Sequence, residues 1–208
     1  MDNYVLPKKP EPSEKYVELV EAYKDLHKEE DKFRGISLVP FAYDIYNILL
    51  HNNCKSILDY GCGKAIPYKE NHRDVDPKKK IPNFDKPLHK WWGVDELFLY
   101  DPAYPEHDKL PTKKYDMVIC TDVLEHIPEE DLDWVIRELC SFSQSTMFIN
   151  VSTLPAKKTF KTGKYKGENV HVTVHDHEWW LNKVSEIWND NKNLKIYLTS
   201  TSNEGIMG

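Results

Sequence analysis

Long apolar segments are missing from this sequence of 208 residues. No stretch approaches the roughly 18–20 apolar residues that a membrane-spanning helix needs, so we expect no membrane association. Residues 1–7 have neither a basic head nor an apolar middle, so we also expect no signal peptide. These absences favour a soluble protein of the cytoplasm.

Paired cysteines are missing too, and basic residues do not predominate. The four cysteines stand singly, which indicates reduced thiols rather than a disulfide framework or a cysteine zinc site: Cys54, Cys62, Cys120 and Cys140. The formal net charge is −6. Because neutralising phosphates needs a surplus of basic residues, this balance argues against general nucleic-acid binding.

What is present has the length of one domain. Residues 1–13 hold three prolines among charges and predict a flexible tail, so the domain itself would cover residues 14–208. Residues 14–52 have the apolar spacing of helices. Residues 71–90 are charged and contain three prolines and the run Lys78-Lys79-Lys80, which predicts a loop-like insertion.

Short apolar runs and helical periodicities alternate along the domain. The apolar runs predict strands at 56–60, 97–100, 115–120, 147–151 and 194–198. Three-and-four spacing predicts helices that begin at Ser13 or Glu14, at Leu38, at Pro128 and near Asp176. Because parallel strands need a crossover between them, this alternation predicts an α/β fold with a mostly parallel sheet flanked by helices.

A glycine turn follows the first predicted strand, in the run Asp59-Tyr60-Gly61-Cys62-Gly63. Ligands of such sheets bind at the carboxyl ends of the strands, and glycines there let the backbone approach a ligand closely. A dinucleotide fingerprint needs a further glycine where Ile66 stands, which disfavours a nicotinamide-dependent oxidoreductase. The Asp59 carboxylate can take an ammonium group, and NAD has none.

Three stretches resemble the class I S-adenosylmethionine (SAM) methyltransferases, in particular the type 11-like ones. They are 57–63 with the glycine turn, Asp101, and 115–127 with the run Asp122-Val123-Leu124-Glu125-His126. Residues 153–158, 169–171 and 179–180 extend the resemblance to a branch seen in phage and bacterial genomes. The resemblance implies a Rossmann-like methyltransferase fold in which residues 14–52 form a lid. For a phage protein, the location would be the host cytoplasm.

The resemblance also implies which residues bind SAM. The glycine turn would wrap the methionine part, the acid that ends the second strand would hold the ribose hydroxyls, and the end of the third strand would lie near the reaction centre. Carried over, these residues are Asp59, Gly61, Cys62, Gly63, Asp101, Thr121 and Asp122.

The spacing of the ribose acid departs from the family pattern. Asp101 lies 38 residues after Gly63, whereas roughly half that spacing is usual, and the insertion at 71–90 accounts for the excess. Asp95 is therefore a rival for the ribose role. Only a short connection joins Asp101 to Tyr115, so we expect the fold to be shortened after its second strand.

Side chains that follow the third predicted strand are candidates for catalysis. His126 suits a general base because imidazole titrates near neutral pH, whereas Glu125 can simply cap a turn. With His171 as the second catalytic candidate, the sequence predicts methyl transfer from SAM to a small or medium polar acceptor. A histidine base favours oxygen as the nucleophile.

Two other functions stay open at this point. Carboxylates and imidazoles could bind one divalent metal, with Asp122, Glu125, His126 and His171 as ligands and His175 and His177 as rivals of His171. This set is similar to that of the small-RNA 3′-terminal 2′-O-methyltransferases, which implies a metal-assisted methyltransferase of a terminal RNA ribose. A protein that binds or consumes SAM without methyl transfer is the other alternative.

Five lysines follow the fourth predicted strand, at 157, 158, 161, 164 and 166. In the family this connection borders the acceptor pocket, so an anionic acceptor is favoured, while a solvated charged loop is the alternative. The sequence leaves open the identity of the acceptor and the oligomeric state.

Overall fold

The computed structural model of the chain describes residues 10–70 and 85–201. Its sheet has the strand order β2-β1-β3-β4-β5, and all neighbouring strands are parallel. The strands are β1 (Ser56–Tyr60), β2 (Glu96–Tyr100), β3 (Tyr115–Thr121), β4 (Ser143–Ser152) and β5 (Lys195–Thr201). The predicted α/β fold is confirmed: the chain forms a Rossmann-like parallel sheet flanked by helices.

Helices cover both faces of the sheet. Their bounds are α1 (Glu14–His27), η1 (Val39–Phe41), α2 (Ala42–His51), α3 (Ile66–Lys69), α4 (Leu88–Trp92), η3 (Leu124–His126), η4 (Glu129–Asp131), α5 (Leu132–Phe142), α6 (His177–Trp188) and η5 (Asn189–Asn191). The helices α5 and α6 pack on the face that carries Leu58 and Val118, whereas α2 and α4 pack on the face with Ile57 and Met117. Because both faces are buried, the central strands are continuous apolar runs.

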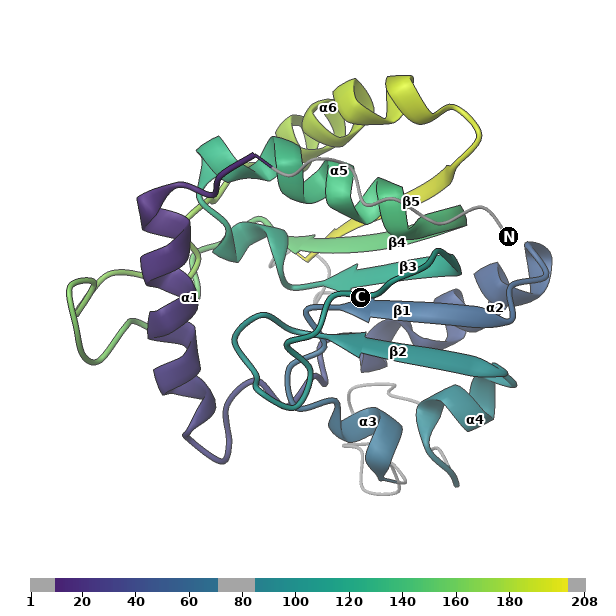
Figure 1. Cartoon of the computed structure of the whole chain (residues 1–208), viewed down its shortest axis with the longest axis horizontal. Coiled ribbons are helices and arrows are strands. Elements are labelled where there is room, and N and C mark those ends of the chain that lie inside the picture. Colours follow the sequence, from purple (N-terminus) through teal and green to yellow (C-terminus); the bar gives the residue numbers. More distant parts are fainter. Residues whose placement is uncertain (1–9, 71–84, 202–208) are drawn as a thin grey trace, which may run out of the picture.

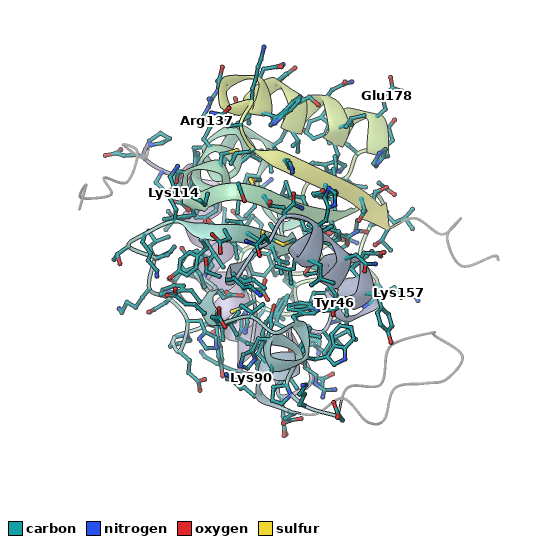
Figure 2. The ribbon with its side chains drawn as sticks, turned by 90° about the vertical axis from the view of Figure 1, so that its right-hand side faces the viewer. Tyr46, Lys90, Lys114, Arg137, Lys157 and Glu178 are labelled. Atoms are coloured by element: carbon teal, nitrogen blue, oxygen red, sulfur yellow. The ribbon has the colours of Figure 1, made fainter. Side chains whose placement is uncertain are left out.

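The molecule is thus built in three layers. In Figure 2, Lys90 of α4 lies at the end of the molecule opposite Arg137 of α5 and Glu178 of α6. No helix of the described ranges is both long and apolar enough to span a membrane.

Several predicted boundaries were wrong. The strand β4 begins at Ser143 rather than at 147. Its first residues are polar and gave no apolar signal, but Ser143 and Thr146 still pair with β3. The helix expected at Pro128 begins at Leu132, after the 3-10 turn η4. Residues 101–114 contain neither helix nor strand, so the predicted shortening after the second strand is confirmed.

Parts of the predicted tail and insertion lie outside the described residues, namely 1–9 and 71–84. The last residues of the insertion belong to α4, which begins at Leu88. Ser13, the last residue of the expected tail, caps α1 by accepting a hydrogen bond from Tyr16 N at 3.0 Å. Ser13 N and Oγ donate to the Asp131 carboxylate at 3.0 and 2.5 Å, which holds the start of α1.

The segment expected to form a lid divides into two parts. Figure 1 shows α1 lying across the ends of the strands to which the arrowheads point, which are the carboxyl ends. By contrast, η1 and α2 belong to the core, where Val39, Ala42, Ile45 and Leu49 are buried against the sheet. Only α1 is therefore placed to cover a site at the strand ends.

Candidate functional site

The strand order reverses between β1 and β3, since the chain passes from β1 to β2 on one side and returns to β3 on the other. At such a point the connections diverge and leave a crevice outside the carboxyl ends of the strands, where open α/β sheets bind ligands. A cavity of about 690 Å³ occupies this place, and α1 contributes Tyr16, Leu19 and Tyr23 to its lining. Small-molecule sites have volumes of about 300–1,000 Å³.

Apart from the rival Asp95, every residue that the sequence marked for SAM binding or catalysis lines this cavity. They come from the ends of three strands and from the loop before α6: Asp59, Gly61, Cys62, Gly63, Asp101, Thr121, Asp122, His126 and His171. The fold therefore brings together positions that are more than a hundred residues apart in the chain.

Asp59 lies near the end of β1 and is buried, with 1% of its surface exposed. Its Oδ2 atom and the neighbouring Tyr68 hydroxyl have no partner within 3.5 Å among the described residues, although this hydroxyl is close enough to act as a hydrogen-bond donor to the carboxylate. Burial raises the pKa of Asp59 to about 7; Tyr68 opposes this rise, and Asp101 adds to it. A buried carboxylate is suited to a cationic ligand, because pairing would offset the cost of burying the charge.

The two glycines of the turn are required by packing within the protein. A Cβ atom on Gly61 would lie 2.2 Å from Cγ2 of Val123, and one on Gly63 would lie 2.3 Å from the carbonyl oxygen of Phe33. Both glycines have positive φ, 83° and 56°. The atoms that approach the two glycines closely thus belong to Val123 and Phe33 of the same chain rather than to a ligand. The turn itself still lines the cavity.

The loop 33–35 is a part of the site that sequence reasoning missed. Lys64 N donates to Phe33 O at 2.7 Å, which fixes this loop to the glycine turn. A Cβ atom on Gly35 would lie 2.3 Å from the carbonyl oxygen of Cys62. The one signal in the sequence is the presence of a glycine between two helices, and it does not say where the loop packs.

Asp101 directly follows β2. Its Oδ2 accepts a hydrogen bond from Gly63 N at 2.9 Å, and its Oδ1 accepts one from Ala103 N at 2.8 Å. Burial raises the pKa of Asp101 to about 6, although these backbone donors oppose the rise. The rival Asp95 precedes β2, is exposed, and does not line the cavity. Of the two acids, Asp101 is the one placed to contact a ligand there.

His27, the last residue of α1, is a second cavity residue that the sequence did not reveal. Its ring stacks between Phe33 and Tyr104, with centroid distances of 4.7 and 5.2 Å. Its Nε2 lies 3.8 Å from Oδ1 of Asp101, and its Nδ1 has no hydrogen-bond partner among the described residues. Burial and the charge of Lys64 lower the pKa of His27 to about 4, so the ring is neutral at pH 7.

Thr121 ends β3, and Asp122 follows it with a positive φ of 53°. Few residues other than glycine adopt this left-handed conformation, and it is concentrated at functional sites. Asp122 N donates to Asn150 O at 3.1 Å, which fixes the turn beside β4. Burial raises the pKa of Asp122, while Ser37 and His171 oppose the rise.

His126 and His171 meet edge to face, with ring centroids 4.9 Å apart. Nδ1 of His126 lies 2.8 Å from Val170 O, and Nδ1 of His171 lies 2.7 Å from Leu154 O. Because a carbonyl oxygen only accepts, Nδ1 carries the proton in each neutral ring and Nε2 carries the lone pair. Burial and the neighbouring His171 lower the pKa of His126 to about 3. His126 is therefore neutral at pH 7, rather than titrating near neutrality as expected.

Glu125 does not line the cavity. It is fully buried, and its Oε1 accepts a hydrogen bond from Ser152 N at 2.7 Å. Its backbone carbonyl accepts from Val172 N and Thr173 N at 2.9 and 3.0 Å. Burial raises the pKa of Glu125 to about 8, and Asp122 adds to the rise. These contacts are those of a side chain that joins the end of β4 to the turn after β3.

His175 and His177, the rivals of His171, lie outside the cavity lining. Nε2 of His175 is 2.8 Å from the Glu129 carboxylate, and Nδ1 of His177 is 3.0 Å from the Ser200 hydroxyl. His171 is thus the histidine that the segment before α6 brings to the site.

Within residues 10–70 and 85–201, no group of three or more His, Cys, Asp or Glu side chains is arranged to hold a metal ion. Three of the four candidate ligands nevertheless line the cavity: Asp122, His126 and His171. The metal-assisted alternative stays a prediction.

Three of the five lysines after β4 line the cavity: Lys157, Lys158 and Lys161. Lys164 does not line it and instead forms an ion pair with Glu18 at 2.7 Å, which ties the lysine-rich loop to α1.

No protein-family model, curated protein or solved structure matches this chain. Its fold and site define a Rossmann-like α/β protein with a small-molecule cavity at the reversal of the strand order. The resemblance to methyltransferases rests on the sequence motifs.

Proposed function

We propose that the protein is a SAM-dependent methyltransferase that binds SAM in the cavity that α1 helps to line. The observation that supports this most is that two buried acids, Asp59 and Asp101, line the same cavity. The two acids end neighbouring strands, β1 and β2. SAM carries an ammonium group at one end and ribose hydroxyls further along, so one ligand can use both acids.

Each residue has a defined part in this proposal. Asp59 pairs with the ammonium group, Asp101 accepts hydrogen bonds from the ribose, and His27 contributes a neutral ring beside Asp101. SAM, when bound, supplies an electrophilic methyl group on a sulfonium. The helix α1 covers the strand ends and excludes water from them.

The two histidines serve the acceptor. Both present an unprotonated Nε2, because both Nδ1–H groups are held by backbone carbonyls. Both Nε2 lone pairs can orient an acceptor hydroxyl. His171 is the one placed to take its proton as the new bond to carbon forms, because His126, with a pKa lowered to about 3, is too weak a base. This chemistry favours oxygen as the nucleophile and a polar acceptor. A location in the cytoplasm is part of the proposal.

Ligand-dependent melting of the full chain tests the proposal. S-adenosylhomocysteine at about 100 times its Kd should raise the Tm by roughly 5–10 °C, while NAD should leave it unchanged. A rise with NAD alone would contradict the proposal. Incubation with SAM and a search for methylthioadenosine then separates transfer from consumption of SAM, since a SAM-consuming protein forms that product without an acceptor.

A further inference from the structure

The cavity has charges of opposite sign at its buried and exposed sides. Its buried side carries the acids Asp59 and Asp101 at the strand ends. At its exposed rim the lining includes Arg34, Lys157 and Lys158 from two separate loops, besides Lys32, Lys161 and Asp31. Figure 2 labels Lys157, which is exposed to solvent. A ligand that fills the cavity would therefore meet carboxylates at one end and cations at the other.

The rim cations differ from the other basic residues around them. Among the described residues, Arg34, Lys157 and Lys158 have no carboxylate within 4.0 Å. The neighbouring lysines are engaged, since Lys32 pairs with Asp31 at 2.7 Å and Lys161 pairs with Glu29 at 3.2 Å. Unpaired cations beside paired ones leave a net positive potential at the rim, in a chain whose formal net charge is −6.

The rim is held close to the histidine pair. Val170 N donates to Lys158 O at 3.3 Å, so the segment that positions His126 through Val170 also positions Lys158. Lys158 Nζ lies 6.0 Å from the centroid of the Phe33 ring, and Phe33 precedes Arg34 in the chain. An anionic group at the rim would therefore lie near the two Nε2 atoms that serve the acceptor.

We propose that the acceptor is a small phosphate monoester whose phosphate binds to Arg34, Lys157 and Lys158, and whose hydroxyl faces His126 and His171. This inference rests on the proposed methyl transfer. A phosphate dianion matches several cations better than a single carboxylate does, because charge-assisted hydrogen bonds from Arg and Lys can reach separate oxygens. The acidic net charge opposes a long polyanion and favours a small molecule.

Calorimetric titration of the full chain with ribose 5-phosphate tests the site, with unphosphorylated ribose as the uncharged probe. We expect the phosphate ester to bind and ribose not to bind. The double substitution Lys157→Ala with Lys158→Ala should weaken binding by about tenfold or more, and Arg34→Gln should weaken it as well. The matched control is Lys166→Ala, because Lys166 is on the same loop but outside the cavity lining. Its substitution should leave the affinity unchanged.

Equal affinities for the double variant and Lys166→Ala would overturn the inference, as would a single-stranded oligonucleotide that binds more tightly than the ester. S-adenosylhomocysteine binding is measured on the same samples and separates the two proposals. Phosphate binding that depends on Lys157 and Lys158, without S-adenosylhomocysteine binding, removes the methyltransferase but keeps the anion site. The reverse result removes the anion site alone.

Discussion

Asp59 ionises at a cost, because its carboxyl group is buried and the nearby Tyr68 hydroxyl opposes that cost only in part. Burial raises the pKa of this carboxyl to about 7, so near neutrality a bound cation decides its charge. The fold keeps an acid here although an apolar residue would fit a buried strand end. A buried carboxyl group that destabilises the free protein but can pair with a cationic ligand is typical of a binding site.

We expect Asp59→Asn to weaken S-adenosylhomocysteine binding by about tenfold or more, since a hydrogen bond to a charged group contributes about 1.5–3 kcal/mol. The same variant should melt no lower than the wild type at pH 8, because asparagine cannot acquire a buried charge. Calorimetry and thermal melting measure the two effects. Asp95→Asn, at the exposed start of β2, is the matched control and should change neither. Unchanged affinity in Asp59→Asn would refute the role of Asp59.

The sequence predicted the place of Asp59, but it left open whether Glu125 faces the cavity or caps a turn. Asp59 is constrained by a strand and a glycine turn, whose geometry is local. Glu125 lies three residues from Asp122, yet its side chain turns to Ser152 N rather than to the cavity. The direction of the Glu125 side chain depends on the position of Ser152 at the end of β4. The sequence around Glu125 contains no information on that position.

At the scale of elements, the glycine turn and the loop 33–35 form one interlocked unit. Gly63→Ala should lower the free energy of unfolding by about 2–4 kcal/mol, because its Cβ would meet Phe33 O and alanine disfavours positive φ. Gly163→Ala should cost only about 1 kcal/mol, since Gly163 also has positive φ but no atom within 4 Å of its Cβ. Urea denaturation measures both. Equal losses in the free energy of unfolding for the two variants would show that the contact between residue 63 and Phe33 O does not contribute to stability.

The helix α1 is fastened over the cavity by a hydrogen bond near its carboxyl end. The Tyr23 hydroxyl donates to Val170 O at 2.8 Å, the same carbonyl that holds Nδ1 of His126. The Tyr23 ring also meets His126 edge to face, with centroids 5.4 Å apart. One carbonyl oxygen, Val170 O, therefore helps to fix both the position of α1 and the orientation of the His126 ring.

Tyr23→Phe keeps the ring and removes the hydroxyl, so it should loosen α1 without unfolding the sheet. Hydrogen exchange of α1 amides should become about fivefold faster, corresponding to about 1 kcal/mol, while β3 amides stay unchanged. Tyr46→Phe on α2 is the matched control, because its ring packs on Trp91 and no hydrogen bond of its hydroxyl is found among the described residues. Faster exchange in both variants would show that the Tyr23–Val170 bond is not what holds α1.

The elements themselves could largely be predicted from sequence, and their long-range placement could not. The strand β1 is a buried apolar run that glycines end, so its bounds follow from local chemistry. The stacking of His27 between Phe33 and Tyr104 joins residues from two distant segments, and neither segment carries a periodic signal for it. The cavity is made of such contacts, which is why the motifs predicted several of the residues that line it but not the packing of His27 and the loop 33–35.

At the scale of the whole molecule, burial raises the pKa of four acids among the described residues: Asp101 to about 6, Asp59 to about 7, Glu125 to about 8, and Asp122. An acid with a raised pKa binds more protons in the folded state, so its contribution to stability is lost as pH rises through the folded pKa. The lowered pKa values of His27 and His126, about 4 and 3, act in the opposite direction. Above the ordinary histidine pKa of about 6.5 these two histidines are neutral in both the folded and the unfolded state, so they no longer change the free energy of unfolding as the pH rises.

Because the two effects end at different pH values, there is a pH range in which only the acids change the stability of the protein. Between about pH 6.5 and 8.5 the Tm of the free protein should fall, because Asp59 and Glu125 ionise while buried and the histidines no longer change charge. The fall should be smaller in Asp59→Asn, and smaller in wild type saturated with S-adenosylhomocysteine, whose ammonium group would pair with the Asp59 carboxylate. Differential scanning fluorimetry across this range measures all three curves. A Tm of the free protein that rises with pH would contradict the raised pKa values of Asp59 and Glu125. A saturated curve parallel to that of the free protein would show that the ligand does not engage the acids at the strand ends.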